Sequence, residues 1–324
     1  MEAGVFGELA LGREFEIVVA GGGMAGLAAG LTAARLGRST LVLTGTTLGG
    51  HLVTIEKIDG YPGFPEGVPG YDLCPIAQEQ AMGAGAEFAT TNVTGLTRTG
   101  DVWHVATEGE AFTAGAVILA TGTRLRDLGV PGEDALRGHG VSQCASCDAP
   151  LLRNQPVVVA GGGDSALQEA LTLAMHCSAV TIVHRGAEFS AQEAYRSLVA
   201  AEPKITAMPE SEVAAVLGDG GVTGVRIRNV ASRSESELAC TAAFVFVGLA
   251  PNTGFLPDRS LLDAAGYIVV DTALRTRLPG LLAAGTVRAG AVGRAAAASG
   301  DGAAAAVAAD RFLATREWRV GPPA

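Results

Sequence analysis

Residues 15–26, FEIVVAGGGMAG, decide the fold of this 324-residue chain. The apolar run FEIVVA predicts a buried strand, the glycines predict a tight turn, and the apolar spacing of LAAGLTAARLG at 27–37 predicts a helix. A second strand follows in STLVLTG at 39–45. A strand, a glycine turn, a helix and a strand within about 30 residues form the unit that binds a dinucleotide pyrophosphate.

The three glycines of this turn have separate expected roles. Gly21 permits the tight turn, Gly23 lets the backbone approach the phosphates, and Gly26 lets the helix pack closely on the strand. The N-terminus of the helix offers free N–H groups and a positive dipole end to the anion. The turn is therefore expected to hold a nucleotide cofactor.

The same design returns at residues 156–183. PVVVA predicts a strand, GGGDSA the turn, LQEALTLAMHC the helix and AVTIVH the next strand, with Ala166 in the third glycine role. Two such motifs predict an α/β protein with two Rossmann-like nucleotide-binding domains and two cofactors that exchange electrons. The candidate residues of this second turn are Gly161, Gly163, Asp164 and Ser165.

Further apolar segments extend the prediction. AVILATGTRL at 116–125 predicts a strand that passes under a flavin nucleotide, and AAFVFVGLAPNTGFL at 242–256 predicts a buried strand leading into a turn. LLAAGTVRAG at 281–290 is strand-like and precedes an alanine-rich helix from about Arg294. The end, REWRVGPPA at 316–324, is expected to be frayed.

Composition excludes several classes of protein. With 48% apolar and 17% charged residues the chain can fill real cores, and its net charge of −10 without a basic patch argues against nucleic-acid binding. The start, MEAGVFGELALGREF, lacks the basic and apolar segments of a signal peptide, and no apolar stretch can span a bilayer. We therefore expect a cytoplasmic protein that does not bind membranes.

The segment VSQCASCDAP at 141–150 predicts redox chemistry. Two residues separate Cys144 from Cys147, the spacing of a redox disulfide. A zinc site would need a second ligand pair, so no metal is expected. Asp148 is either a helix cap or an acid that protonates a leaving thiolate. Three isolated cysteines are interpreted as inert packing residues: Cys74, Cys177 and Cys240.

The order of motifs resembles that of the low-molecular-weight thioredoxin reductases over nearly the whole chain. It runs GGGMAG, LGGHL, GYPGFPEG, ATGTRLRDLGVPGE, CASCD, GGGDSA, VHRGAEF, VGLAPNT and AAGT. The position of CASCD just ahead of the second glycine motif is the most specific feature. In the lipoamide and glutathione reductase branch the redox cysteines follow the first Rossmann helix, where this chain has LGGHLVTIEKI without a cysteine.

The resemblance implies a discontinuous FAD-binding domain, 1–126 and 254–324, around an inserted NAD(P)-binding domain, 127–253, that carries the dithiol. It implies FAD with NADPH or NADH, a homodimer, and a rotation that brings nicotinamide and dithiol to the flavin alternately. It also implies that Cys147 faces the flavin and that Cys144 attacks the substrate disulfide. The remaining cofactor-binding residues that it implies, beyond the two glycine turns, are Thr44, Gly49, Gly50, His51, Thr121, Gly122, His184, Arg185, Gly285, Thr286, Arg294 and Ala295.

Two departures concern the flavin. Thr286 stands where the family has an aspartate that contacts the ribityl chain of the flavin. Val292, Gly293 and Arg294 replace the family's Tyr-Arg-Gln, so Arg294 begins the last helix. Arg294 is either solvated or a cation that stabilises the reduced flavin.

A third departure concerns the nicotinamide nucleotide. Where the family has several arginines around the 2′-phosphate of NADPH, HRGAEFSA keeps Arg185 and has Gly186 and Ser190 in place of the other two. Much of the positive charge that would hold the 2′-phosphate is missing. Glu188 is nearby, but no acidic residue ends the strand to favour NADH. The choice between NADPH and NADH stays open at this point.

The leading interpretation is a thioredoxin-reductase-like enzyme that passes electrons from NAD(P)H through FAD and the Cys144–Cys147 disulfide to a thioredoxin-type protein or a small disulfide. Three alternatives remain. The first is an FAD-dependent oxidase of a small-molecule dithiol with oxygen as the acceptor. The second is a non-catalytic redox- or nucleotide-sensing module, and the third is a ferredoxin–NADP reductase of similar fold.

Overall fold

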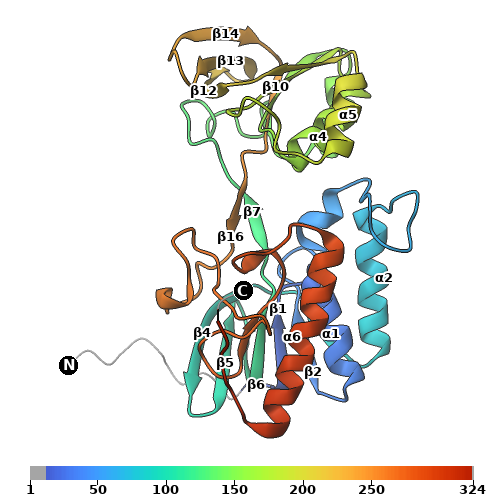
Figure 1. Cartoon of the computed structure of the whole chain (residues 1–324), viewed down its shortest axis with the longest axis vertical. Helices are drawn as coiled ribbons and strands as arrows, with labels where there is room; N and C mark the ends of the chain where they lie inside the picture. Colours follow the sequence, from blue (N-terminus) through green and yellow to red (C-terminus); the bar gives the residue numbers. More distant parts are fainter. Residues whose placement is uncertain (1–11, 323–324) are drawn as a thin grey trace, which may run out of the picture. The chain divides into compact units, whose positions relative to one another are not determined.

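The computed structural model describes residues 12–322. The chain divides into two compact units: unit 1 comprises residues up to Arg124 and from Pro251 onward, and unit 2 comprises Leu125–Ala250. The two segments that join the units, β7 (Thr123–Leu125) and β16 (Leu249–Pro251), pair with each other (Figure 1). Unit 1 is thus interrupted by unit 2. Which cofactor each unit binds remains a prediction.

Within residues 12–322, unit 1 is built on a seven-stranded sheet. Its order is β3-β2-β1-β6-β5-β4, with β17 also paired to β6. The pairings among β1, β2, β3, β6 and β17 are parallel, whereas β4, β5 and β6 form an antiparallel meander. The strands are β1 (Glu14–Ala20), β2 (Thr40–Leu43), β3 (Glu87–Ala89), β4 (Val93–Thr99), β5 (Val102–Thr107), β6 (Ala111–Leu119) and β17 (Leu281–Ala283).

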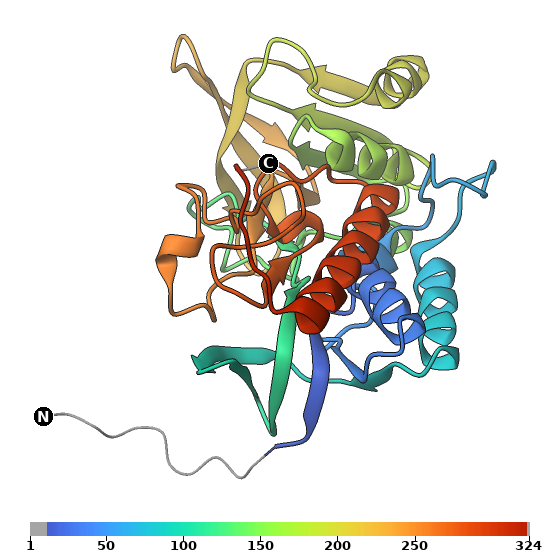
Figure 2. The same ribbon diagram turned by 60° about the horizontal axis from the view of Figure 1, so that its bottom comes forward.

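Three helices of unit 1 lie side by side in both views (Figures 1 and 2). They are α1 (Met24–Arg35), α2 (Gly70–Gly83) and α6 (Ala295–Thr315). The approach of α1 and α6 depends on Gly302, where a Cβ would lie 2.0 Å from the carbonyl oxygen of Ala25. A larger residue at this crossing would push the two helices apart.

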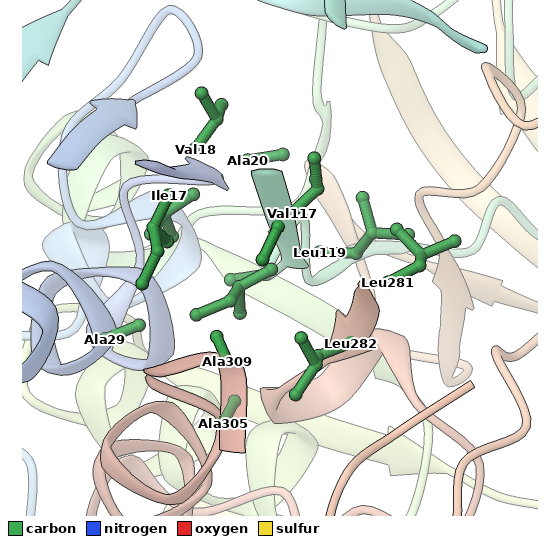
Figure 3. Close-up of a cluster of buried hydrophobic side chains, with 14 of the residues drawn as sticks. Ile17, Val18, Ala20, Ala29, Val117, Leu119, Leu281, Leu282, Ala305 and Ala309 are labelled. Carbon is green, nitrogen blue, oxygen red and sulfur yellow. The ribbon is translucent and has the colours of Figure 1, made fainter. Parts of the chain in front are cut away.

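The core of unit 1 lies between the central strands and the helices. Ile17 and Val117, from the paired strands β1 and β6, are fully buried together with Leu281 and Leu282 of β17 (Figure 3). Alanines on α1 and α6, among them Ala305, let the helices approach the sheet closely. Strands buried in this way read as continuous apolar runs, and FEIVVA does so for this reason.

Unit 2, all of whose residues are described, contains a five-stranded parallel sheet and a separate three-stranded antiparallel sheet. The parallel order is β11-β10-β9-β15-β8, and the small sheet has the order β12-β13-β14. The helices are α3 (Ala145–Asp148), α4 (Asp164–Ala174) and α5 (Glu193–Ala201). The strands are β8 (Val141–Ser142), β9 (Pro156–Ala160), β10 (Ala179–Val183), β11 (Ile205–Met208), β12 (Ser211–Gly218), β13 (Val222–Asn229), β14 (Glu235–Ala239) and β15 (Ala242–Val245).

Both glycine motifs lie between a strand and a helix, as predicted, but the segment 281–290 differs from its prediction. The strand β17 ends at Ala283, and a 3-10 turn, η4 (Gly285–Val287), follows it. Gly285 has a φ of +73°, a left-handed conformation that a continuing strand cannot contain. The expected strand-like run therefore becomes a turn halfway along its length.

The end of the chain is another correction, because its described part, residues 316–322, is anchored rather than frayed. The ring of Trp318 packs edge-on against Phe312 at 5.0 Å, and its Nε1 donates to the carbonyl oxygen of Thr276. The N–H of Gly321 donates to the buried carboxylate of Asp271. Within residues 12–322 no helix is long and apolar enough to cross a membrane.

Candidate functional site

In the first glycine turn two glycines are tightly packed and a third has open space around it. A Cβ on Gly21, whose φ is +127°, would lie 2.1 Å from the carbonyl oxygen of Ala120. A Cβ on Gly26 would lie 1.8 Å from the carbonyl oxygen of Gly21. Around Gly23 the nearest described atom is the Gly49 carbonyl oxygen, at 4.0 Å. Gly21 and Gly26 are therefore required by packing, whereas Gly23 leaves space for a ligand.

The N-terminus of α1 adds polarity to this open corner. Gly23 is the N-cap of the helix, no described side chain caps it, and the first turn holds no acidic residue. The first N–H groups of the helix are therefore available, and the positive end of the dipole is not neutralised locally. An open glycine beside an uncapped helix fits the pyrophosphate of a dinucleotide.

The segment from Thr44 to His51 packs against the same turn. The N–H of Gly49 donates to the Gly22 carbonyl at 2.9 Å. The Cα and Cβ of Thr44 lie 2.8 Å from where a Cβ on Gly22 would be. Gly49 and Gly50 both have left-handed backbones, with φ of 86° and 55°. Desolvation lowers the pKa of His51, which favours the neutral form of its imidazole.

Two segments distant in sequence complete the corner in unit 1. The Thr121 hydroxyl donates to the carbonyl of Asn252 at 2.8 Å, and the Asn252 amide donates back to the Thr121 carbonyl at 3.0 Å. The Thr286 hydroxyl lies 3.2 Å from the Thr123 hydroxyl and 3.6 Å from where a Cβ on Gly122 would be. Asn252 was not identified from the sequence as a site residue, although the PNT turn that contains it was noted.

Arg294 and Ala295 stand at the start of α6. Arg294 is the N-cap, its side chain is exposed, and its Nη1 donates to the carbonyl of Gly293 at 3.0 Å. Ala295 is buried. The prediction that Arg294 begins the last helix is confirmed, and its role toward the flavin remains a prediction.

The dithiol lies in unit 2. Cys144 and Cys147 form a disulfide with Cα atoms 5.4 Å apart, and Cys147 is exposed while Cys144 is half-buried. The N–H of Cys147 points at the Cys144 sulfur at 3.3 Å. Asp148 ends α3 and makes no capping hydrogen bond to the 3-10 turn that follows, so its capping interpretation is not supported there.

The dithiol helix is fixed by α4. Ala145 and Ala149 are buried against Ala166 and other apolar residues of that helix. The N–H of Ala145 donates to a carboxylate oxygen of Glu169 at 2.9 Å. Sequence reasoning missed Glu169, because nothing in LQEALTLAMHC distinguishes a glutamate that reaches back to the dithiol from a solvated one. The second glycine helix thus also orients the disulfide.

The other cysteines are packing residues, as expected. Cys74, Cys177 and Cys240 are buried. Burial raises the pKa of Cys74 and of Cys240 to about 11, and it also raises the pKa of Cys177. Thiols held in this state are poor nucleophiles. Redox chemistry is left to the Cys144–Cys147 pair.

The second glycine turn repeats the geometry of the first. A Cβ on Gly161, whose φ is +136°, would lie 2.2 Å from the Phe246 carbonyl oxygen. Ala166 occupies the third position and is fully buried. Gly163 again faces open space, with the Ser190 hydroxyl the nearest described atom at 3.7 Å, and no side chain of unit 2 caps α4. Gly161 and Ala166 are thus packed and Gly163 is open, whereas the approach of Gly163 to a phosphate remains a prediction.

Acidic and basic side chains around this turn are mostly engaged. The Asp164 carboxylate accepts hydrogen bonds from the backbone and side chain of Gln192, at 2.7 and 3.1 Å, which draws α5 toward the turn. Glu188 pairs with Arg196 at 3.2 Å. Ser165, at the start of α4, is exposed. Hydrogen bonds within the protein therefore occupy the Asp164 carboxylate, and an arginine pairs with Glu188.

The strand end beyond the turn carries the last candidate residues. His184 is buried with its ring 4.4 Å from Phe189, and desolvation lowers its pKa. Arg185 is exposed. The Ser190 N–H and hydroxyl both donate to the Gly162 carbonyl, so this side chain serves the loop itself. Within HRGAEFSA, Arg185 is the remaining cation that a ligand can reach.

Comparison with known proteins gives a consistent result. Residues 15–302 match the pyridine nucleotide-disulphide oxidoreductase family. The thioredoxin reductase of Treponema pallidum is 39% identical over 93% of this chain and 98% of its own length. That of Mycolicibacterium smegmatis is also 39% identical, over 93% of this chain and 97% of its own.

Solved structures agree. The thioredoxin reductase of Lactococcus lactis, in its FR conformation, superimposes with a TM-score of 0.90 at 37% identity, covering 93% of this chain and 99% of its own. That of T. acidophilum gives 0.89 at 32% identity, covering 94% and 100%. The predicted α/β fold with two Rossmann-like nucleotide-binding domains is confirmed.

Proposed function

Because the chain belongs to the pyridine nucleotide-disulphide oxidoreductases, and within them to the thioredoxin reductases, we propose that its substrate is a thioredoxin-type protein. The chain is a flavin-dependent oxidoreductase that uses FAD and a nicotinamide nucleotide. The observation that carries the proposal is the Cys144–Cys147 disulfide, held by α4 just ahead of the second glycine turn. NAD(P)H donates the electrons, and the disulfide of the partner accepts them and is reduced to two thiols.

FAD supplies a carrier that accepts two electrons from the nicotinamide and returns them to sulfur. The Cys144–Cys147 bond takes up these two electrons and breaks into two thiolates, and one of them gains a proton that Asp148 passes on from solvent. The thiolate attacks the disulfide of the partner and forms a mixed disulfide, while one partner sulfur leaves as thiolate. The second cysteine then attacks the mixed disulfide, which restores Cys144–Cys147 and releases the reduced partner.

Three further features belong to the proposal. We propose that residues 1–126 and 254–324 hold FAD and that 127–253 hold the nicotinamide nucleotide, in agreement with an open glycine turn in each unit. We also propose a cytoplasmic homodimer, as implied by the resemblance.

We expect the purified protein to sediment as a dimer. We also expect each nucleotide to protect the glycine turn of its own unit from proteolysis.

We expect the purified chain to contain FAD despite Thr286. One hydrogen bond to a charged partner contributes about 1.5–3 kcal/mol, which a tightly bound flavin can lose. The Thr286 hydroxyl, held by Thr123 at 3.2 Å, still offers a neutral partner. Thr286→Asp should lower the FAD dissociation constant about tenfold, measured by fluorescence titration. A colourless protein that takes up no added FAD would contradict this expectation.

We expect weak discrimination between NADPH and NADH. Arg185 is the one accessible cation in HRGAEFSA, and Ser190 is bonded to Gly162 instead of facing a phosphate. The ratio of kcat/KM for the two nucleotides should lie well below a thousandfold, which would need about 4 kcal/mol. Ser190→Arg should raise the preference for NADPH over NADH. Arg185→Ala should abolish the small preference for NADPH that the unchanged chain has. A thousandfold preference in the unchanged chain would refute this prediction.

The same reduced positive charge favours one alternative, an oxidase of small-molecule dithiols with oxygen as the acceptor. It would use the same disulfide and flavin in the opposite direction. Anaerobic addition of NADPH or NADH separates the two functions. Rapid bleaching of the flavin by either nucleotide supports the reductase, whereas bleaching only by a dithiol supports the oxidase.

A further inference from the structure

A partly buried ion pair lies behind the Gly285–Thr286 turn of unit 1. The side chains of Arg288 and Asp301 are only 13% and 16% exposed. The guanidinium contacts both carboxylate oxygens, with Nε 2.7 Å from Oδ2 and Nη2 3.0 Å from Oδ1. Oδ2 also accepts the backbone N–H of Gly285 at 3.0 Å. Asp301 on α6 therefore binds both the backbone N–H of Gly285 in the turn and the side chain of Arg288 just after it.

The anchored turn is pressed against the first turn of α1. A Cβ on Gly285 would lie 2.8 Å from the Cβ of Ala25, and a Cβ on Gly302 would lie 2.0 Å from the Ala25 carbonyl oxygen. Ala25 follows Gly23 and Met24 at the open, uncapped start of α1. Asp301 and its neighbour Gly302 thus hold α6 and the 285–286 turn against the corner that fits the pyrophosphate.

The charges of the pair cancel. Arg288 meets both oxygens of the Asp301 carboxylate, so the pair adds no net charge behind the turn. Thr286 is uncharged, so the carboxylate that contacts the turn comes from α6. The arrangement fixes the turn without adding net negative charge to it.

We propose that Asp301, paired with Arg288, is a positioning residue for FAD: it acts by holding the Gly285–Thr286 turn, not by touching the reacting atoms. The inference rests on the proposed function, because it places FAD at this corner. It assigns to Asp301 a part in cofactor binding beyond the one expected for Arg294 and Ala295 at the start of α6.

The test compares two aspartates of the same helix. Asp310 also lies on α6 and pairs with an arginine, Arg38, at 2.7 Å, but that pair contacts Glu16 and not the 285–286 turn. Asp301→Ala, Asp301→Asn and the control Asp310→Ala are made in the full chain. FAD release from each holoenzyme on dilution gives its dissociation constant, and thermal unfolding gives its stability.

We expect Asp301→Ala to raise the FAD dissociation constant about tenfold to a hundredfold, the loss of a hydrogen-bonded charged anchor. Asp301→Asn should raise it less, because its amide oxygen can still accept the Gly285 N–H. Asp310→Ala should leave it within about twofold, although both alanine variants lose some thermal stability. The visible spectrum of bound flavin should change only in the Asp301 variants.

Equal dissociation constants for Asp301→Ala and Asp310→Ala would overturn the inference alone, since the wild-type chain would still bind FAD. A wild-type chain that binds no FAD would overturn the proposed function and the inference with it. Should Asp301→Ala not fold, Asp301→Asn carries the test, and an unchanged dissociation constant and spectrum would then overturn the inference.

Discussion

Replacing either Cys144 or Cys147 by serine is expected to lower disulfide reductase activity about a thousandfold or more, because the reaction then lacks a nucleophile or a resolving thiol. Flavin reduction by the nicotinamide nucleotide should survive in both variants, since that half-reaction does not involve sulfur. Steady-state assays with oxidised thioredoxin and anaerobic flavin bleaching measure the two steps separately. Cys240→Ala, which changes a buried cysteine outside the dithiol, is the control and should keep both activities.

The two serine variants should differ in what they trap. In Cys147→Ser the Cys144 sulfur remains and can form a mixed disulfide that no second cysteine resolves, so a covalent adduct with the partner is expected. Cys144→Ser should capture little. The opposite pattern would exchange the roles of the two sulfurs, which the exposure of Cys147 makes worth testing. Full activity in both variants would show that the dithiol is not the catalytic centre.

Alanine at Gly23 and at Gly26 is expected to fail in different ways. Gly23 has an ordinary extended backbone, with φ of −76°, and open space around it, so Gly23→Ala should fold normally and lose FAD affinity about a hundredfold because its methyl group occupies the phosphate position. At Gly26 a Cβ would lie 1.8 Å from the Gly21 carbonyl oxygen. Gly26→Ala should therefore lower the free energy of unfolding by about 3 kcal/mol.

The control is Gly83→Ala at the end of α2, where a Cβ meets no described atom within 4 Å. It should change neither FAD affinity nor stability by much. Circular dichroism melting and FAD titration of the three variants make the comparison. A Gly23→Ala protein that binds FAD as tightly as the wild type would place the phosphates elsewhere.

Local sequence patterns were sufficient for the parts of the fold that local physics determines. The run FEIVVA is buried because helices cover it, and the glycine turns take the conformations that their left-handed glycines permit. Ala166 replaces the third glycine of the second turn, and its methyl group is fully buried there. The dithiol was recognisable from its spacing alone.

Contacts between distant segments were not predictable in the same way. Asn252 bonds Thr121 across 131 positions, and Asp301 holds a turn formed 16 residues earlier. Asn, Asp and Glu are common on surfaces, so their types carry no sign of such partners. The anchored tail was missed for the same reason, since Trp318 donates to Thr276, which lies 42 residues earlier in the chain. The site residues that were missed are therefore those that join segments.

The most direct test of the account is anaerobic. The holoenzyme is mixed with NADPH, and separately with NADH, and oxidised thioredoxin is then added while flavin absorbance is followed. We predict that the nucleotide bleaches the flavin and that thioredoxin restores its colour in the wild type but not in Cys144→Ser. A flavin that neither nucleotide bleaches, or one whose colour returns only when oxygen is admitted, would contradict the assignment as a thioredoxin-reducing enzyme.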